Sequence, residues 1–220
     1  MEWENRYNVR CFDDSVPVLE KDIQYLKNIF QYVPTQQSLM DNIWFTLTEE
    51  HNDFKIWLLE NIFYRVDIED GYVREYMVSL ISAPLVFLST IIGYNWSIQD
   101  AYRNSGIAAG AVGSAALKLG YDISFKGCTE GMFWKLGEHQ QQQKNYDQKV
   151  KEFHEHLYKI FGKEIIKNTG IKETIPFHPG MVLSIGKGLP LTNTQEKYKK
   201  YKNYLYFSGQ KTKKPWSGVI

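Results

Sequence analysis

The sequence has few cysteines, no long apolar run and no excess of one charge. Its two cysteines, Cys11 and Cys128, cannot form a disulfide framework and fit a reducing compartment. The longest apolar stretch, residues 80–92, is broken by serine, proline and threonine, and a membrane span needs roughly 20 apolar residues. Its 26 basic and 25 acidic residues leave a net charge of +1, which excludes nucleic-acid binding driven by overall charge.

The first residues also lack the pattern of a secretory leader. Acidic residues follow Met1 where a signal peptide needs bases, and no apolar core comes after them. We therefore expect a cytoplasmic protein with no membrane segment.

What is present is an ordinary globular composition. Apolar residues make up 43% of the chain and 16 residues are glycine, which excludes disordered and collagen-like proteins. No linker or internal repeat divides the chain, so we expect one domain over residues 1–220. Residues 191–220 carry seven lysines against one acidic residue. This basic C-terminal arm indicates an anionic partner, or it is a solvated segment with no partner.

Apolar spacing predicts both helices and strands. Helical periods are found over residues 17–33, after an N-cap at Asp53, over residues 98–119 with Gly120 as the C-cap, and along a late helix. The apolar stripe of the late helix consists of Tyr146, Val150, Phe153, Leu157 and Ile160, preceded by a solvated segment at residues 140–143. Strands are predicted over residues 44–48, 84–92, 121–126 and 181–185. Helices between buried strands indicate an α+β or α/β fold with a sheet covered by helices.

Three glycines lie along one face of the helix predicted over residues 98–119. Gly106, Gly110 and Gly113 follow the spacing i, i+4, i+7, and each costs about 1 kcal/mol in helix propensity. A helix tolerates this cost where another backbone or a ring must come very close along that face. Two interpretations remain open, namely tight packing inside one chain and a helix pair across a dimer interface.

The familiar catalytic and nucleotide-binding motifs are absent from the sequence. No G-x-G-x-x-G follows a predicted strand, and residues 180–188 lack the spacing and the Ser or Thr of a P-loop. His154 and His156 are two residues apart on a helix and point to different sides, which argues against a metal site. We therefore predict neither a dedicated catalytic side chain nor a bound metal.

Cationic residues toward both ends of the chain indicate a divided phosphate site. Arg6 and Arg10 are four residues apart, so on a helical turn they would share a face and could grip one phosphate. Asn8 could add a hydrogen bond from the same turn. Lys211 and Lys213 place further positive charge in the C-terminal arm. Together the two clusters predict a phosphate site built from both ends of the chain.

Taken in order, these segments resemble the nitroreductase-like family of FMN-dependent flavoproteins. That family opens with a basic stretch followed by V-P and a helix, and continues with a proline-led loop that ends in a tryptophan strand. An A-P element before an apolar strand, a long central helix, a P-I-E-G turn and a terminal K-S-R come next. The corresponding segments here are residues 6–13, 16–17, 34–45, 83–88, 100–120, 128–131 and 211–213.

The resemblance implies a nitroreductase-like α+β fold, with a mixed central β-sheet covered by helices and the long central helix at a homodimer interface. It also implies FMN as the cofactor, NADH or NADPH as the reductant, and ping-pong transfer of hydride to a nitroaromatic, a quinone or a similar flat small molecule. The phosphate and ribityl chain would be held by Arg6, Asn8, Arg10, Lys211 and Lys213.

The same resemblance implies which residues meet the flavin ring. Glu130 and Gly131 would lie against the isoalloxazine, with the backbone N–H of Gly131 reaching N5. Tyr7, Cys128 and Thr129 complete the implied cofactor-binding set. We interpret Cys128 as a small packed residue rather than as a redox thiol.

Two alternatives remain beside the reductase. One is a flavin-binding relative that consumes the flavin and does not use it to reduce an acceptor. The other is a nucleic-acid-binding protein, because residues 197–207 interleave lysines with aromatic side chains in the manner of single-strand binders. A yellow protein with flavin absorbance would favour the reductase or the flavin-consuming relative over the nucleic-acid-binding protein.

Overall fold

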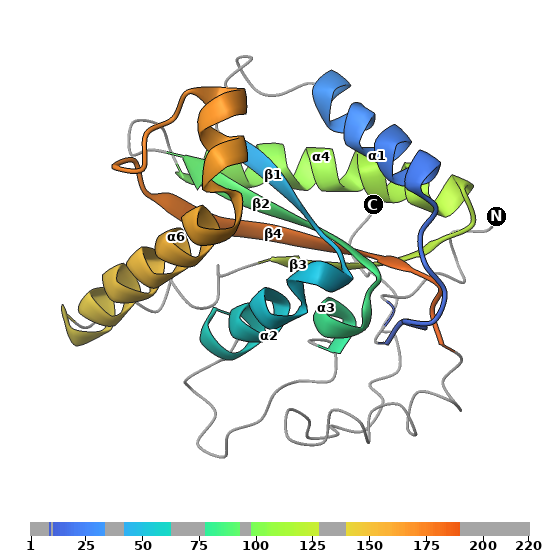
Figure 1. Ribbon diagram of the computed structural model, residues 1–220, viewed down its shortest axis with the longest axis horizontal. Coiled ribbons are helices and arrows are strands. Elements are labelled where there is room, and N and C mark those ends of the chain that lie inside the picture. The colour runs from blue at the N-terminus through green and yellow to red at the C-terminus, as the bar shows by residue number, and fades with distance from the viewer. Residues whose placement is uncertain are drawn as a thin grey trace, which may run out of the picture.

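A computed structural model describes residues 9, 11–33, 42–62, 78–92, 98–127 and 140–189. Figure 1 shows how its elements are arranged. The helices are α1 (Glu20–Tyr32), the short 3-10 helix η3 (Glu49–His51), α2 (Asn52–Asn61), α3 (Val78–Ser82), α4 (Ile98–Lys118) and α6 (Gln140–Thr169). The strands are β1 (Asn42–Leu47), β2 (Leu85–Ile92), β3 (Asp122–Gly127) and β4 (Phe177–Gly186).

The four strands form one sheet in the order β1-β2-β4-β3. Every neighbouring pair is antiparallel. The family resemblance implies a mixed sheet, which also needs a parallel pair, and the described strands contain none. β2 and β4 are central strands with helices over both faces, and nearly every residue of both strands is buried. This two-sided burial explains why β2 is apolar almost throughout instead of alternating.

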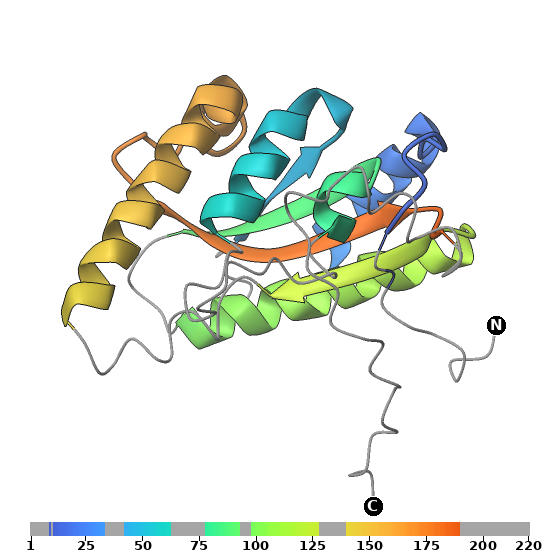
Figure 2. The ribbon, with the colours of Figure 1, turned by 90° about the horizontal axis from the view of Figure 1, so that it is seen from below.

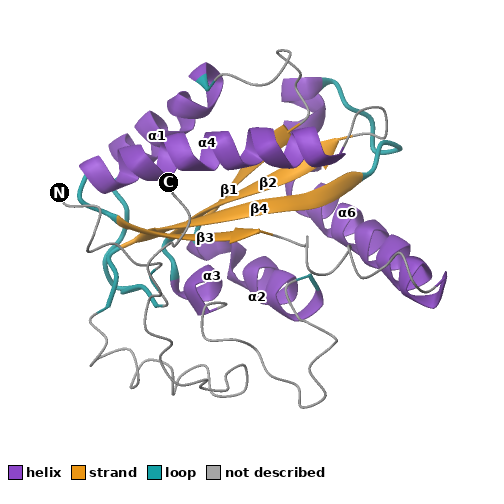
Figure 3. Cartoon of the chain, turned by 180° about the vertical axis from the view of Figure 1, so that it is seen from behind, coloured by secondary structure: helices purple, strands orange, loops and turns teal. Residues whose placement is uncertain are grey.

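Helices cover the sheet on both faces, which makes an α+β protein of three layers. Figure 3 shows α1 and α4 on one face, and α2 and α3 on the other. The core on the α1–α4 face contains Leu26, Phe87, Val112, Leu183 and Ile185. The core on the opposite face, where α6 also packs, contains Phe12, Leu58, Leu88, Phe153 and Val182.

α1 is shorter than the helix predicted over residues 17–33. Leu19 is still extended, with φ −66° and ψ 137°, and the first helical residue is Glu20. At the other end Val33 is extended again, with φ −71° and ψ 125°. The residue before a proline is disfavoured in the helical region, so Pro34 ends the helix as the sequence indicated.

Asp53 does not cap α2, which corrects the sequence-based prediction. The chain first makes the 3-10 turn η3, and Thr48 and His51 form a reciprocal capping box there, in which the Thr48 N–H donates to His51 Nδ1 at 3.1 Å. α2 continues directly from this turn, so its start needs no further cap. Asp53 lies in the first turn of α2, where a carboxylate is favourable to the helix dipole.

α4 matches its prediction closely. It runs from Ile98 to Lys118, and Gly120 follows with φ +84°, the left-handed conformation of a glycine C-cap. Of the three glycines on its face, Gly113 is explained by packing inside the chain, because an added Cβ would meet Phe125 Cζ at 2.7 Å and Ile123 Cδ1 at 3.1 Å. At Gly110 an added Cβ would meet nothing within 4 Å.

α6 is longer than predicted and its apolar stripe is placed differently. It begins at Gln140, so residues 140–143 belong to the helix and are not a separate segment before it. Ile160 is 37% exposed, whereas Tyr158 and Ile165 are buried and continue the stripe. Tyr158 is buried because the chain after α6 folds back onto it: its ring lies 5.8 Å from that of Phe177 in β4, and its hydroxyl donates to the carbonyl of Ile171 at 3.2 Å. Figures 1 and 2 show the first turns of α6 reaching beyond the sheet.

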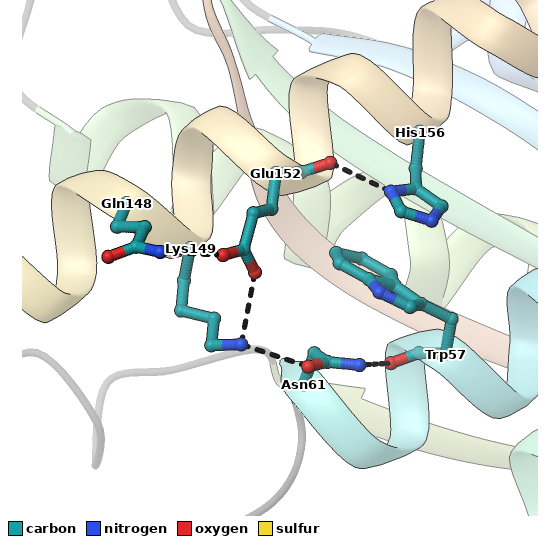
Figure 4. Close-up of polar contacts among 6 residues, drawn as sticks. All are labelled: Trp57, Asn61, Gln148, Lys149, Glu152 and His156. Atoms are coloured by element: carbon teal, nitrogen blue, oxygen red, sulfur yellow. Dashed lines mark hydrogen bonds and ion pairs between the residues drawn. The ribbon is translucent and has the colours of Figure 1, made fainter.

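A polar and aromatic clamp holds α6 against α2 (Figure 4). Trp57 of α2 stacks on His156 of α6, with ring centroids 4.2 Å apart. Lys149 donates to Asn61 Oδ1 at 2.9 Å and also donates to Glu152 Oε2, with which it forms an ion pair at 3.0 Å. The hydrogen bond from Lys149 to Glu152 is the main reason that the pKa of Glu152 is lowered. His156 and His154 both take part in structural contacts, and no cluster of three metal-ligating side chains occurs among the described residues.

Within the described ranges, no helix has both the length and the apolar character required to cross a membrane.

Candidate functional site

The residues predicted to bind the cofactor all lie outside the part of the chain that the structure describes. They are Arg6, Tyr7, Asn8, Arg10, Cys128, Thr129, Glu130, Gly131, Lys211 and Lys213. Along the sequence they form three groups, at residues 6–10, 128–131 and 211–213, and the first two groups are next to described residues. Val9 and Cys11 are the neighbours of Arg10 in the sequence, and Gly127 at the end of β3 is followed by Cys128. The site can therefore be built from its described borders.

The first border is the segment from Val9 to Asp13. The Val9 N–H donates to the carbonyl of Ile123 in β3 at 3.2 Å, and Phe12 pairs with Gly188 beyond the end of β4. The Phe12 N–H also donates to Ser82 Oγ of α3 at 3.0 Å. These bonds fix the backbone on both sides of position 10 against the beginning of β3.

The second border is the side of β3 that faces away from α4. Ile123 and Phe125 pack toward α4, so Ser124 and Lys126 lie on the opposite face of this strand. There the hydroxyl of Ser79, on α3, donates to Ser124 Oγ at 3.0 Å, and the ammonium of Lys126 donates to Ser79 Oγ. Ser79, Ser124 and Lys126 are all buried. A lysine at this depth is unusual, because burial of an ammonium is costly unless polar groups receive it.

Ser184 completes what we call the polar row, defined as Ser79, Ser124, Lys126 and Ser184. In the register of the sheet Ser184 of β4 lies directly opposite Ser124 of β3. Its side chain is fully buried, and within the described ranges its hydroxyl oxygen has no hydrogen-bond partner. The row therefore contains a hydroxyl that can still bond to water or to a ligand.

A second buried lysine supports α3 from the other side. Lys55 of α2 is 1% exposed and donates to the carbonyl of Ala83, directly after α3, at 3.1 Å. Burial lowers its pKa to about 8, although Glu49 nearby acts in the opposite direction. α3 is thus held between two buried ammonium groups, and all five of its residues are buried. Contacts from both β3 and α2 therefore hold this short helix in place.

The described neighbours of Arg10 and of Cys128 lie at opposite ends of β3. Asp122 pairs with Gly186 and accepts a hydrogen bond from the Gly188 N–H at 2.8 Å, beside the segment from Val9 to Asp13. Gly127, at the other end, pairs with Met181. Five residue steps of a strand span about 16 Å. The described neighbours of Arg10 therefore lie at one end of a strand about 16 Å long, and residues 128–131 follow its other end in the sequence.

This arrangement fits an elongated ligand that carries negative charge. The polar row contains three hydroxyls and one ammonium group, and since the proton of the Ser79 hydroxyl already goes to Ser124, the donors toward anionic or carbonyl oxygens would be Ser124, Ser184 and Lys126. A mononucleotide with a phosphate at one end and a flat ring at the other has the length and the charge that such a strand can serve. The described residues are thus compatible with FMN.

Sequence reasoning missed the polar row and Lys55. A signal was present for two of these residues, because Ser124 and Lys126 alternate with the apolar Ile123 and Phe125 at the period of a strand. No local pattern marks Ser79, Ser184 or Lys55, since each becomes notable only through its neighbours in space.

No protein-family model matches the chain, and no curated protein matches it in sequence. Solved structures do match its fold. A nitroreductase with bound FMN from Bacteroides fragilis NCTC 9343 has a TM-score of 0.53 at 10% identity, covering 99% of this chain and 95% of that one. An FMN-dependent nitroreductase from Clostridium difficile R20291 has a TM-score of 0.52 at 14% identity, covering 94% and 97%. A nitroreductase family protein from Clostridium novyi NT has a TM-score of 0.50 at 11% identity, covering 94% and 93%.

These likenesses extend over nearly the whole of both chains in each comparison. The protein is therefore of the α+β class, and its fold is the nitroreductase fold. The fold predicted from the sequence is confirmed in this respect.

Proposed function

We propose that this protein is an FMN-dependent NAD(P)H oxidoreductase that passes hydride, in ping-pong fashion, to a nitroaromatic, a quinone or a similar flat acceptor. The observation that carries the proposal is the nitroreductase fold, together with a strand β3 that has the described neighbours of Arg10 beside one end and is followed in the sequence by residues 128–131 at the other. One of the solved structures with this fold is a nitroreductase with bound FMN, and another is an FMN-dependent nitroreductase.

In this proposal the residues of the chain bind and orient the cofactor. Arg6, Asn8 and Arg10 would hold the phosphate and ribityl chain from the N-terminal side, and Lys211 and Lys213 would do so from the C-terminal arm. Glu130 and Gly131 would meet the ring beyond the end of β3. When bound, the flavin supplies the hydride chemistry, and the protein supplies position and electrostatics.

We also propose that the protein is a homodimer and resides in the cytoplasm. Gly110 lies on α4 where an added Cβ would meet no atom of the described residues within 4 Å, the backbone of α4 itself aside, and Ile107 one turn earlier is half exposed. A second copy of α4 could approach this face closely, as the glycine spacing indicates.

The cofactor is tested directly by identifying what the purified protein carries. We expect non-covalent FMN, which can be released by denaturation and separated from FAD by chromatography. Stopped-flow mixing with NADH and with NADPH should then bleach the flavin absorbance, and steady-state lines should be parallel when both substrates are varied. A protein that takes up no FMN, even after reconstitution, would contradict the proposal. If FMN binds but neither nucleotide reduces it, a role that consumes flavin becomes the better interpretation.

The phosphate site is tested by Arg10→Ala. Loss of one charge-assisted contact to phosphate costs about 1.5–3 kcal/mol, so the Kd for FMN should rise roughly 10- to 150-fold. Fluorescence titration measures this, and Arg103→Ala on α4 is a matched control because Arg103 is exposed and far along the sequence from the predicted phosphate cluster. An equal loss of affinity in both variants would contradict the assignment.

A further inference from the structure

The connection between α6 and β4, residues 170–176, folds back onto α6. Gly170 begins it with φ +68°, in the left-handed region that glycine adopts without strain. The hydroxyl of Tyr158 donates to the carbonyl of Ile171 at 3.2 Å. One turn earlier on α6, the ring centroid of His154 lies 4.7 Å from that of Tyr158 and 5.9 Å from that of Phe177, where β4 begins. Two side chains of α6 therefore hold the connection.

His154 bonds to this segment through both nitrogens of its ring. The Phe177 N–H donates to His154 Nδ1 at 3.3 Å, and His154 Nε2 lies 2.6 Å from the carbonyl oxygen of Glu173. A backbone N–H can only donate and a carbonyl oxygen can only accept, so Nδ1 carries no proton and Nε2 carries one. Both bonds exist together only in this neutral tautomer of the ring.

A second proton on the ring would break one of these bonds. It would sit on Nδ1 and point at the Phe177 N–H, so that two donors would face each other. Phe177 is 0% exposed, and a buried N–H without an acceptor is costly. The N–H regains a partner when the connection opens and admits water. Because histidine takes up a proton between about pH 8 and 5, acidification should favour the open form.

Other titratable side chains lie on the segments that meet at His154. They are Lys151, Glu155 and Tyr158 on α6, Glu173 in the connection and His178 on β4. The first two pair with each other at the surface, 3.9 Å apart. Burial, aided by Glu173, raises the pKa of Tyr158, so this hydroxyl stays a donor as the pH falls. Glu173 is exposed and its charge is screened by solvent, and His178 points to the opposite face of β4 from Phe177.

We propose that this contact is an acid-sensitive latch, in which protonation of His154 releases residues 170–176 from α6 while α6 stays docked on α2. The inference does not depend on the flavin assignment. The contact between α6 and α2 tolerates acid, because His156 Nδ1 lies 3.1 Å from the carbonyl oxygen of Glu152 and already carries its proton. A charged His156 ring keeps this bond and its stacking on Trp57.

Hydrogen exchange, resolved by segment with mass spectrometry, tests the latch on the full chain at pH 7.5 and 5.5. Each rate is corrected for the intrinsic pH dependence of exchange. Loss of one hydrogen bond should lower the protection of residues 170–177 about 2- to 12-fold at pH 5.5, whereas residues 150–165 of α6 should keep theirs. His51 also accepts from a backbone N–H, that of Thr48, but burial lowers its pKa and its signal falls in a different segment.

Two variants assign the response to one side chain. His154→Asn carries an amide oxygen near the position of Nδ1 and does not titrate, so its connection should be equally protected at both pH values. His156→Asn, the matched control on the same helix, should keep the full response to acid. An unchanged response in a folded His154→Asn variant, or no fall in protection in the unmodified protein, would overturn the proposal.

The unmodified protein also offers a test that needs no variant. NMR of the ring nitrogens distinguishes the two neutral tautomers of histidine from the charged ring. At pH 7.5 His154 should be the Nε2–H tautomer, and its protonation should coincide with the rise in exchange of residues 170–177. An Nδ1–H tautomer at His154, or exchange that rises at a pH where His154 does not titrate, would show that the latch does not exist.

Discussion

At the scale of single residues, the most unusual feature is the number of buried polar side chains around α3. Lys55 and Lys126 are both almost fully buried, and Ser79, Ser124 and Ser184 lie beside Lys126. Groups of this kind cost stability unless they are bonded, so each one predicts a measurable response to substitution.

Lys55 predicts how stability depends on pH. Burial lowers its pKa from 10.5 to about 8, so the unfolded chain binds this proton more tightly than the folded chain does. Between pH 8 and about 10.5 the unfolded state therefore binds more protons, and the contribution of Lys55 to stability rises with pH. Its penalty is fully present below pH 8, and about 3 kcal/mol should be recovered across this window.

The measurement is the free energy of unfolding in urea for the unmodified protein and for Lys55→Met, from pH 7 to 10.5. Taking the difference between the two removes the contributions of tyrosines that titrate in the same range. We expect the unmodified protein to gain stability relative to Lys55→Met as pH rises. Lys118→Met, an exposed lysine, should show no such trend, and a flat difference for Lys55→Met would contradict the burial argument.

Ser184 predicts a stabilising substitution. Its hydroxyl is buried without a hydrogen bond, and an unsatisfied buried group costs about 1–3 kcal/mol. Ser184→Ala removes that group and should raise the free energy of unfolding by about 1 kcal/mol. Ser124→Ala is the matched comparison, because it removes the acceptor for Ser79 and should lower stability by a similar amount. Destabilisation by both substitutions would mean that Ser184 bonds to an internal water.

At the scale of secondary structure elements, α4 fits closely against β3 at Gly113. An added Cβ at Gly113 would come within 2.7 Å of the Phe125 ring, whereas at Gly106 it would meet only Met181 Sδ at 3.9 Å. Alanine favours a helix over glycine by about 1 kcal/mol at either position. The two sites therefore differ in packing and not in backbone preference.

Gly113→Ala should consequently be less stable than Gly106→Ala. Overpacking a core costs about 1–3 kcal/mol, which cancels or exceeds the gain in helix propensity at position 113. At position 106 the contact is ordinary and the gain should remain. Thermal unfolding of both variants in the same buffer measures the difference, and equal stabilities would show that β3 moves aside without cost.

At the scale of the whole molecule, the outer face of α4 predicts self-association. We expect a homodimer at micromolar concentration, measured by sedimentation equilibrium. Gly110→Leu would push apart two backbones packed there, and should produce monomer, aggregate or a protein that has lost FMN. Lys118→Met, near the end of the same helix, should leave the association unchanged. A flavin-loaded monomer in the unmodified protein would rule this arrangement out.

Much of the fold was determined by the sequence itself. The apolar periods of α1, α4, β1 and β2 and the glycine after α4 depend on neighbours within a few residues, and these elements are found where predicted to within a few positions. The order of the motifs along the chain also indicated the nitroreductase fold, which the likeness to solved structures confirms. The cofactor residues were predicted from the same motifs, and they stay a prediction because they lie outside the described part of the chain.

Other features were decided only by the tertiary structure. The 3-10 turn before α2 takes the place of a cap at Asp53, and residues 140–143 became helical as part of the long α6 that packs on α2. The polar row brings together residues from α3, β3 and β4. Ser79 precedes Ser124 by 45 positions in the sequence, and Ser184 follows Ser124 by 60. Periodicity shows which face of a strand a side chain occupies, but only packing determines what lies opposite that face. For this reason Ser79, Lys126 and Ser184 acquire their chemistry from contacts that no local pattern encodes.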